Sequence, residues 1–201
     1  MKKIFVSIGA VISLLLFSFT SVDPLPIGSA LPKPDKKLTD VTGKQTNLKE
    51  AIDENGLLVM FSCNTCPYVI KNQQRTNAIC SYAQKNGLGV VVINSNEGNR
   101  DADESLEAMK AYALEQHYKW KYVVDSESEL ANAFGANRTP ECFLFNKDLK
   151  LVYHGAIDNN PSDEDNVSRN HLHIAMDEMI SGKDVSVKET KSVGCGIKRK
   201  S

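Results

Sequence analysis

The residues of this sequence best suited to covalent chemistry are two cysteines separated by two residues, Cys63 and Cys66. They follow an apolar run over residues 57–61, typical of a buried strand, and precede Pro67, which suits the first turn of a helix. At a helix start, unpaired N–H groups and the helix dipole favour a thiolate. We therefore expect Cys63 to attack disulfides as a thiolate and Cys66 to resolve the mixed disulfide, the pair itself closing a small disulfide.

Other uses of this pair remain open. It could form a structural disulfide without turnover, or supply half of a zinc site, although a four-cysteine zinc site requires a second close pair. Haem attachment is excluded, because Pro67 stands where that motif requires histidine. His171 and His173 are two residues apart on an expected helix and point in different directions, so no metal site is expected there.

The remaining three cysteines stand singly in the sequence. Cys80 lies in the helix expected after the pair, about 21 Å along its axis from Cys66, which is beyond the reach of a disulfide. Cys80 and Cys142 are expected to fill the core, with proximity to the pair as the alternative for Cys142. Cys195 lies between two glycines near the C-terminus. It is either an additional redox cysteine or a tail cysteine docked against the body.

The elements that must position the pair predict an α/β fold. Buried apolar runs alternate with amphipathic segments, which is typical of a sheet with helices on both faces. We expect a mixed central sheet of four to five strands. Candidate strands cover residues 38–41, 57–61, 89–93, 122–124, 142–145 and 149–153, and candidate helices cover 67–85, 103–117, 126–134 and 168–181.

The N-terminus has the pattern of an export signal. Lys2 and Lys3 precede an apolar run from residue 4 to residue 20, which ends before Asp23. If it were not cleaved, this run would be near the minimum length for a membrane anchor. The expected division is a signal peptide or membrane anchor at 1–22, a linker or extended arm at 23–37, a folded domain at 38–192, and a cysteine-containing tail at 193–201.

Composition limits the range of functions. The 201 residues include 41% hydrophobic residues, which suits one ordinary folded domain. The 24 basic and 25 acidic side chains leave no basic surplus, which argues against nucleic acid as a partner.

Several stretches of the chain resemble thioredoxin-fold proteins, and more narrowly the peroxiredoxin-like branch of the thioredoxin/redoxin superfamily with a Cys-x-x-Cys-Pro-Tyr motif. The resemblance implies a thioredoxin-like domain with an N-terminal extension. It also implies a cis bond between Thr139 and Pro140, facing the cysteine pair and shaping the substrate groove. The similar stretches are 61–69 (FSCNTCPYV), 122–145 (YVVDSESELANAFGANRTPECFLF), 153–160 (YHGAIDNN) and 194–198 (GCGIK), within roughly residues 30–198.

The sequence departs from its relatives at two places. Thr65 stands where relatives often carry a histidine that would stabilise the thiolate of Cys63. Thioredoxins also bury a carboxylate beneath the pair, but the preceding strand has no acid, and Glu141 is expected to be solvated. The sequence therefore does not identify the group that accepts the proton of Cys66.

The pattern around Cys63 favours thiol–disulfide exchange over peroxide reduction. Peroxiredoxins place their reactive cysteine in a Pro-x-x-x-Thr-x-x-Cys pattern, whereas this chain has Gly56 and Met60 at the proline and threonine positions. Arg138 is expected near the site, but one arginine does not rebuild a peroxide pocket.

Together these features predict an exported, for example periplasmic, thiol–disulfide oxidoreductase without a metal or an organic cofactor. Its partners would be protein or small-molecule thiols and disulfides, and a reductase or oxidant that resets the pair. Membrane contact is expected only if the N-terminal segment is uncleaved. The alternatives are a peroxiredoxin-like peroxidase using Cys63, and a non-catalytic binding module with a structural Cys63–Cys66 disulfide.

Overall fold

Two parallel strands, β3 (Gly56–Ser62) and β4 (Leu88–Asn94), form the centre of the fold, and every residue of both is buried. They appear in a computed structural model that describes residues 23–200, so the export signal expected at 1–22 lies outside the described residues. Strands covered on both faces need apolar side chains throughout, which explains their continuous hydrophobic sequences. β5 (Lys121–Val124) continues the parallel pairing beside β4.

The central sheet has seven strands in the order β2-β1-β5-β4-β3-β7-β8. Antiparallel pairing adds β7 (Glu141–Phe145) and β8 (Leu151–Gly155) on one side, and the hairpin of β1 (Leu38–Asp40) and β2 (Gln45–Thr46) on the other. The mixed α/β sheet is therefore confirmed, but the expected count of four to five strands is wrong. The two residues of β2 are too few to show an alternating pattern in the sequence.

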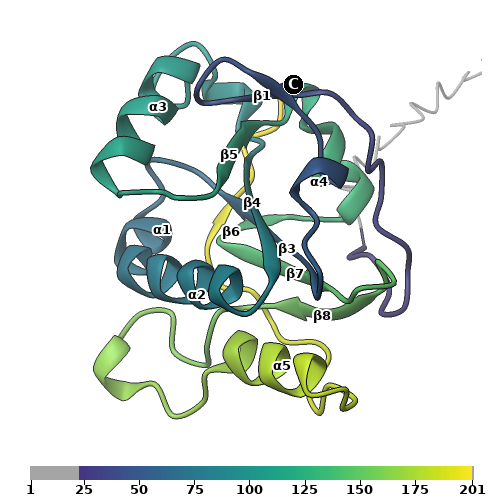
Figure 1. The fold of residues 1–201 in the computed structure, drawn as a ribbon. Coiled ribbons are helices and arrows are strands. Elements are labelled where there is room, and N and C mark those ends of the chain that lie inside the picture. Colours follow the sequence, from purple (N-terminus) through teal and green to yellow (C-terminus); the bar gives the residue numbers. More distant parts are fainter. Residues whose placement is uncertain (1–22, 201) are drawn as a thin grey trace, which may run out of the picture.

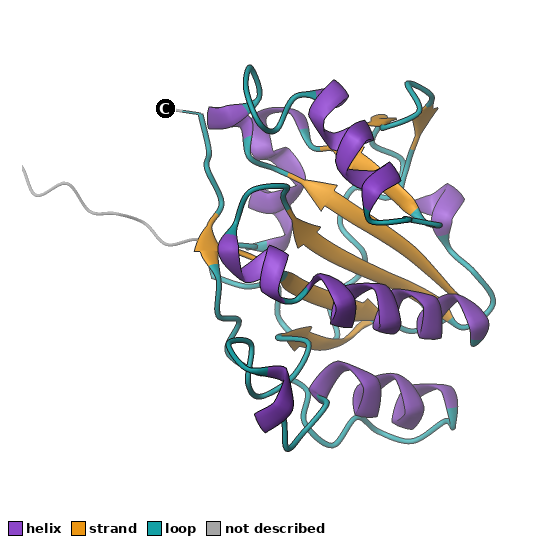
Figure 2. Cartoon of the chain, turned by 90° about the vertical axis from the view of Figure 1, so that its left-hand side faces the viewer, coloured by secondary structure: helices purple, strands orange, loops and turns teal. Residues whose placement is uncertain are grey.

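Helices cover both faces of this sheet (Figures 1 and 2). α2 (Gln73–Lys85), α3 (Leu106–Glu115) and α5 (His171–Ile180) pack with Leu58 and Met60 of β3. α4 (Glu129–Phe134) packs on the opposite face with the alternate residues of the same strand. Short 3₁₀ helices occupy Lys49–Ala51, Glu97–Asn99, Ser126–Ser128 and Glu164–Asn166.

The helix expected over residues 67–85 is interrupted. It consists of α1 (Pro67–Lys71) and α2, with the buried Asn72 between them. The Asn72 side-chain amide donates hydrogen bonds to the carbonyl oxygens of Tyr68, at 2.7 Å, and Pro161, at 2.9 Å. Asn72 therefore ties the break between the helices to the loop that precedes α5.

Both ends of the described chain lie against the domain. In the segment 23–37, Leu31 is buried and the Gly28 N–H donates to the carbonyl oxygen of Leu151 at 2.8 Å. At the other end, Ile197 is buried in the same apolar cluster as Leu31. A separate two-stranded sheet joins β6 (Arg138–Thr139) to β9 (Cys195–Gly196), in the yellow final segment of Figure 1.

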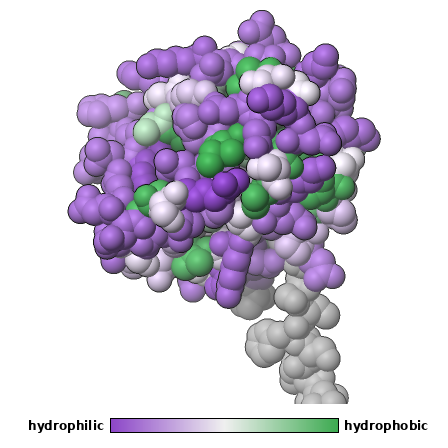
Figure 3. All heavy atoms as spheres, turned by 90° about the horizontal axis from the view of Figure 1, so that it is seen from below, coloured by the Kyte–Doolittle hydropathy of each residue, from purple (hydrophilic) through white to green (hydrophobic). Residues whose placement is uncertain are grey.

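The face of the molecule on the α5 side is mostly hydrophilic, and its apolar residues form separate spots (Figure 3). Within residues 23–200, no helix has the length and apolar character needed to cross a bilayer.

Candidate functional site

The cysteine pair lies where the central strand β3 ends. Cys63 directly follows Ser62, the last residue of β3, and Cys66 directly precedes α1. Both side chains are buried, with 1% of Cys63 and 5% of Cys66 exposed. The sequence therefore located the strand–helix junction correctly, and in this state both side chains are closed off from solvent.

The peptide bond between Thr139 and Pro140 is cis, as the resemblance implied. The Sγ atom of Cys63 lies 3.4 Å from Oγ1 of Thr139, at hydrogen-bonding distance. The Sγ atom of Cys66 lies 3.4 Å from the carbonyl oxygen of the same threonine. Thr139 thus contacts both sulfur atoms of the pair, one through its side chain and one through its backbone.

The disulfide in this structure joins Cys66 to Cys195, and Cys63 is a free thiol. A Cys63–Cys66 disulfide was expected from the spacing, so this pairing is a correction. Its cause is the antiparallel pairing of β9 with β6, which places Cys195 opposite Thr139 and so beside Cys66. The Cα atoms of the bonded cysteines are 6.0 Å apart although 129 positions separate them in the sequence.

The surroundings of Cys63 oppose ionisation of its thiol. Burial is the largest influence and raises the pKa, and the negative charge of Glu104 raises it further. Hydrogen bonds from the Thr139 hydroxyl and from the N–H groups of Cys66 and Thr65 act in the opposite direction. The net result is a pKa above the ordinary cysteine value, whereas the position before a helix had predicted a lowered one.

Glu104 is a buried carboxylate that the sequence analysis did not identify. It accepts hydrogen bonds from the N–H of Asn64 at 3.0 Å, from the hydroxyl of Thr65 at 3.0 Å, and from the side-chain amide of Asn94 at 2.6 Å. It therefore holds both residues between the two cysteines. Neither the strand before the pair nor the neighbourhood of Pro140 supplies this acid, because Glu104 comes from the segment before α3.

Glu141 is also buried, so its expected exposure to solvent is wrong. One carboxylate oxygen accepts the N–H groups of Asn137, at 2.7 Å, and Arg138, at 2.9 Å. The other lies 2.7 Å from Nε2 of His154. Glu141 therefore fixes the backbone that leads into the Thr139–Pro140 bond.

Cys80 and Cys142 are fully buried in the core on the α2 side of the sheet, which confirms their expected packing role. Burial raises the pKa of both thiols.

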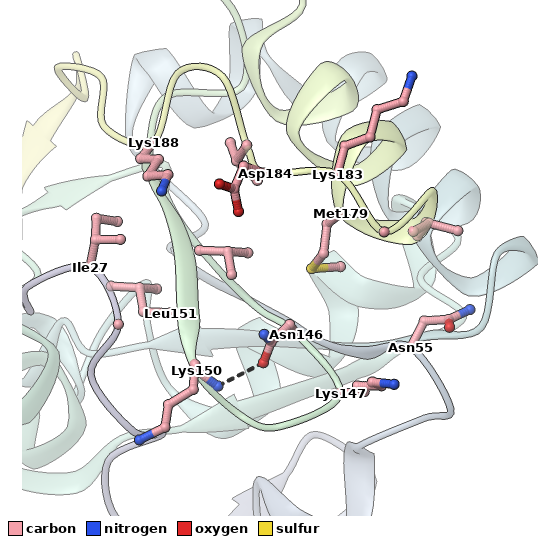
Figure 4. Close-up of a pocket in the computed structure, with 15 residues that line it drawn as sticks. Ile27, Asn55, Asn146, Lys147, Lys150, Leu151, Met179, Lys183, Asp184 and Lys188 are labelled. Carbon is pink, nitrogen blue, oxygen red and sulfur yellow. Dashed lines mark hydrogen bonds between the residues drawn. The ribbon is translucent and has the colours of Figure 1, made fainter.

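A pocket on another part of the molecule contains none of the five cysteines (Figure 4). It lies between the turn joining β7 to β8 and the end of α5. Lys150 and Lys183 line it but extend their ammonium groups away from its centre in Figure 4. The pocket is therefore separate from the cysteine site.

A cysteine pair at the end of a central parallel strand, facing a cis-proline, defines a thioredoxin-fold protein of the oxidoreductase class. More narrowly, the chain belongs to the Redoxin family, whose sequence profile matches residues 26–170. The match ends before α5 and the C-terminal segment.

Two solved structures are similar over most of the chain. A hypothetical protein from Sinorhizobium meliloti 1021 is 33% identical, with a TM-score of 0.81 over 89% of this chain and 97% of that one. An uncharacterized conserved protein from Geobacillus kaustophilus is also 33% identical, with a TM-score of 0.80 over 87% of this chain and 93% of that one.

A named relative is the thiol-disulfide oxidoreductase ResA of Bacillus thuringiensis subsp. konkukian. It is 25% identical over 134 residues, which are 67% of this chain and 72% of the relative. The peroxidoxin BcpB of Mycobacterium tuberculosis, at 14% identity and a TM-score of 0.51 over 78% of this chain and 92% of that one, shares the fold.

Proposed function

We propose that this chain is an exported thiol–disulfide oxidoreductase whose exchange chemistry is carried by Cys63 and Cys66. The observation that carries the proposal is the contact of both sulfur atoms, each at 3.4 Å, with Thr139 directly before the cis-Pro140. A single backbone position can thereby orient the attacking sulfur, the resolving sulfur and an incoming disulfide.

The exchange begins once Cys66 is a free thiol. The Cys63 thiolate attacks one sulfur of a substrate disulfide, forms a mixed disulfide and displaces the other sulfur as a thiolate. Cys66, after losing its proton, then attacks Cys63, displaces the second substrate sulfur and closes a Cys63–Cys66 disulfide. The substrate gains two electrons and the pair loses two, so a thiol partner must reduce the pair again.

Thr139 and Pro140 shape the substrate groove in this proposal. The Thr139 hydroxyl supports the Cys63 thiolate, because its hydrogen bond lowers the pKa of that thiol. The substrates would be protein or small-molecule thiols and disulfides, in keeping with the thiol–disulfide oxidoreductase name of the relative from Bacillus thuringiensis.

Export is proposed from the basic and apolar pattern of residues 1–22. The division into an arm at 23–37, a domain at 38–192 and a tail at 193–201 is part of the same proposal.

Reduction of insulin by dithiothreitol, followed by turbidity, tests the exchange activity of the full chain. We expect Cys63→Ser to fall to the uncatalysed rate and Cys66→Ser to accumulate mixed disulfides with substrate. Cys80→Ala removes a cysteine of the core cluster on the α2 side of the sheet, which is distinct from the cluster of Cys63 and Cys66. It serves as the control, with activity near that of the unmodified chain. A parallel assay of peroxide consumption is expected to show no turnover above background. Full activity of Cys63→Ser in both assays would show that the site is assigned wrongly.

A further inference from the structure

The C-terminal segment 194–199 occupies the groove that the proposed function gives to the substrate. Cys195 pairs with Thr139 and Gly196 pairs with Arg138, so β9 covers the backbone edge of β6. Gly194 makes the close approach possible, because a Cβ atom at this position would lie 2.1 Å from the carbonyl oxygen of Thr139. The segment thus lies where a substrate strand would have to lie.

Contacts beyond Cys195 fix this segment in place. The Ile197 N–H donates to the carbonyl oxygen of Asn137 at 3.1 Å, and the Ile197 side chain is buried. The Lys198 N–H donates to Oδ1 of Asn96 at 2.9 Å, and the Arg199 guanidinium donates to the carbonyl oxygen of Ala136 at 2.7 Å. Gly194 therefore serves close packing, and the residues after Cys195 are held by hydrogen bonds and burial.

The sulfur that must attack the substrate lies in a buried cluster, and Cys195 of this segment is one of the side chains packed against it. Cys63, Cys66 and Val69 form a small buried cluster against which Cys195 and Tyr112 pack. Cys63 is 1% exposed, whereas Cys195 is half-buried. Cys63 is therefore closed to a substrate disulfide in this state, and Cys195 is among the residues that close it.

We propose that Cys195 is a third redox-active cysteine, and that the segment 194–199 is a covalently held cover which Cys63 itself releases. The Cys63 thiolate attacks Sγ of Cys66, a Cys63–Cys66 bond forms, and the Cys66–Cys195 bond breaks. Cys195 leaves as a thiolate and takes up a proton from water, which replaces the proton that Cys63 gave up. One thiol and one disulfide are present before and after, so no external oxidant or reductant is consumed.

This inference rests on the proposed function, because exposing the groove matters only if the protein exchanges disulfides with a substrate. The rearranged form presents a Cys63–Cys66 disulfide ready to accept electrons, together with a free thiol on a released segment. The Redoxin match ends at residue 170, so the cover lies in a part of the chain outside that match.

Trapping of the freed thiol tests the rearrangement without any substrate. The oxidised full chain, freed of small thiols, is incubated under native conditions with N-ethylmaleimide, digested without reduction and mapped by mass spectrometry. We expect alkylated Cys195 and the Cys63–Cys66 disulfide to appear in equal proportion. Alkylated Cys63 with the Cys66–Cys195 bond intact would overturn the proposal, as would labelling of neither cysteine before unfolding.

A pair of glycine variants tests the cover while keeping every cysteine. Gly194→Ala forces a Cβ atom against the Thr139 backbone, so we expect Cys195 to be alkylated at least about tenfold faster. Gly196→Ala is the matched control, because its added Cβ would lie 3.9 Å from the nearest atom, Nη1 of Arg138. Equal rates of Cys195 alkylation in the two variants would contradict the proposal that the segment 194–199 covers the groove. If Gly194→Ala does not fold, the measurement on the unmodified chain decides.

The two proposals fail in different ways. Rearrangement without insulin reduction would overturn the proposed function alone. Insulin reduction with label only on Cys63 would overturn the role of Cys195 alone.

Discussion

Around the free thiol of Cys63, two neighbours act in opposite directions on its ionisation. The hydroxyl of Thr139 supports the thiolate, and the carboxylate of Glu104 opposes it. Glu104 also holds Asn64 and Thr65 in place by hydrogen bonds. The acid that orders the loop between the cysteines therefore also restrains the reactivity of the first cysteine.

We expect Glu104→Gln to make Cys63 more reactive at a given pH. The amide keeps an oxygen acceptor for the loop but removes the negative charge, so the pKa of Cys63 falls. Because only the thiolate reacts, the pH profile of alkylation moves to lower pH and the rate near neutrality rises a few-fold. Iodoacetamide labelling of the reduced chain, quantified at Cys63 by mass spectrometry, measures this effect.

The control for this variant is Glu107→Gln, which removes an exposed charge from the first turn of α3. The pH profile of Cys63 alkylation in this variant is expected to match that of the unmodified chain. A shift of the Glu104→Gln profile to higher pH would show that loop order outweighs charge at this site.

Single residues could be predicted from the sequence where a local pattern carried the information. The strand–helix junction identified Cys63 and Cys66, and the resemblance identified Thr139 and Pro140. Glu104 had no such signal, because it reaches the pair only through folding and is 40 positions from Asn64. Glu141 is the first residue of β7, and whether it meets solvent depends on the position of His154.

Among the elements, α4 begins at a later residue than its sequence pattern indicates. Ser126 and Glu129 resemble a capping box, which predicted a helix start at Ser126. In the structure α4 begins at Glu129, and the buried carboxylate of Asp125 accepts the N–H groups of Leu130, at 2.8 Å, and Ala131, at 2.9 Å. Asp125 therefore performs the capping.

Asp125→Ala is expected to lower the free energy of unfolding by about 2 kcal/mol, because it leaves helix N–H groups without acceptors. Ser126→Ala is the matched control, since Ser126 is exposed, and should change that free energy by less than about 0.5 kcal/mol. Urea unfolding followed by circular dichroism measures both. A larger loss for the serine variant would restore the capping-box interpretation.

On the scale of the whole molecule, a buried ion pair joins α2 to the segment that leads to α5. Nη1 of Arg75 lies 2.5 Å from Oδ2 of Asp158 and 3.0 Å from the carbonyl oxygen of Asn160. Both charged side chains are almost fully buried. Each charge depends on the other, because water cannot solvate either one.

Arg75→Met should lower the free energy of unfolding by about 3 kcal/mol, because it leaves the Asp158 carboxylate buried without its partner. Lys49→Ala breaks the exposed Lys49–Asp35 pair and should cost less than about 1 kcal/mol. Urea midpoints at equal transition slopes compare the two variants. Similar losses for both would mean that the buried pair is dispensable.

The layered sheet could be predicted because its strands and helices have local periodic patterns. The contacts of the C-terminal segment could not, because two-residue strands such as β6 and β9 carry no periodicity. The sequence distance between Cys66 and Cys195 also leaves their pairing to the tertiary fold. The residues of the candidate site could therefore be predicted more readily than the pairing of its cysteines in a disulfide.

The Cys66–Cys195 bond encloses most of the domain, since it spans 129 positions of the chain. In the chain-entropy description, closing a loop of that size restricts the unfolded chain by up to about 5 kcal/mol. Opening the bond during catalysis would then loosen the whole domain as well as the groove. The form with the Cys66–Cys195 bond closed would therefore be the more heat-stable one, and the form with that bond open would be the reactive one.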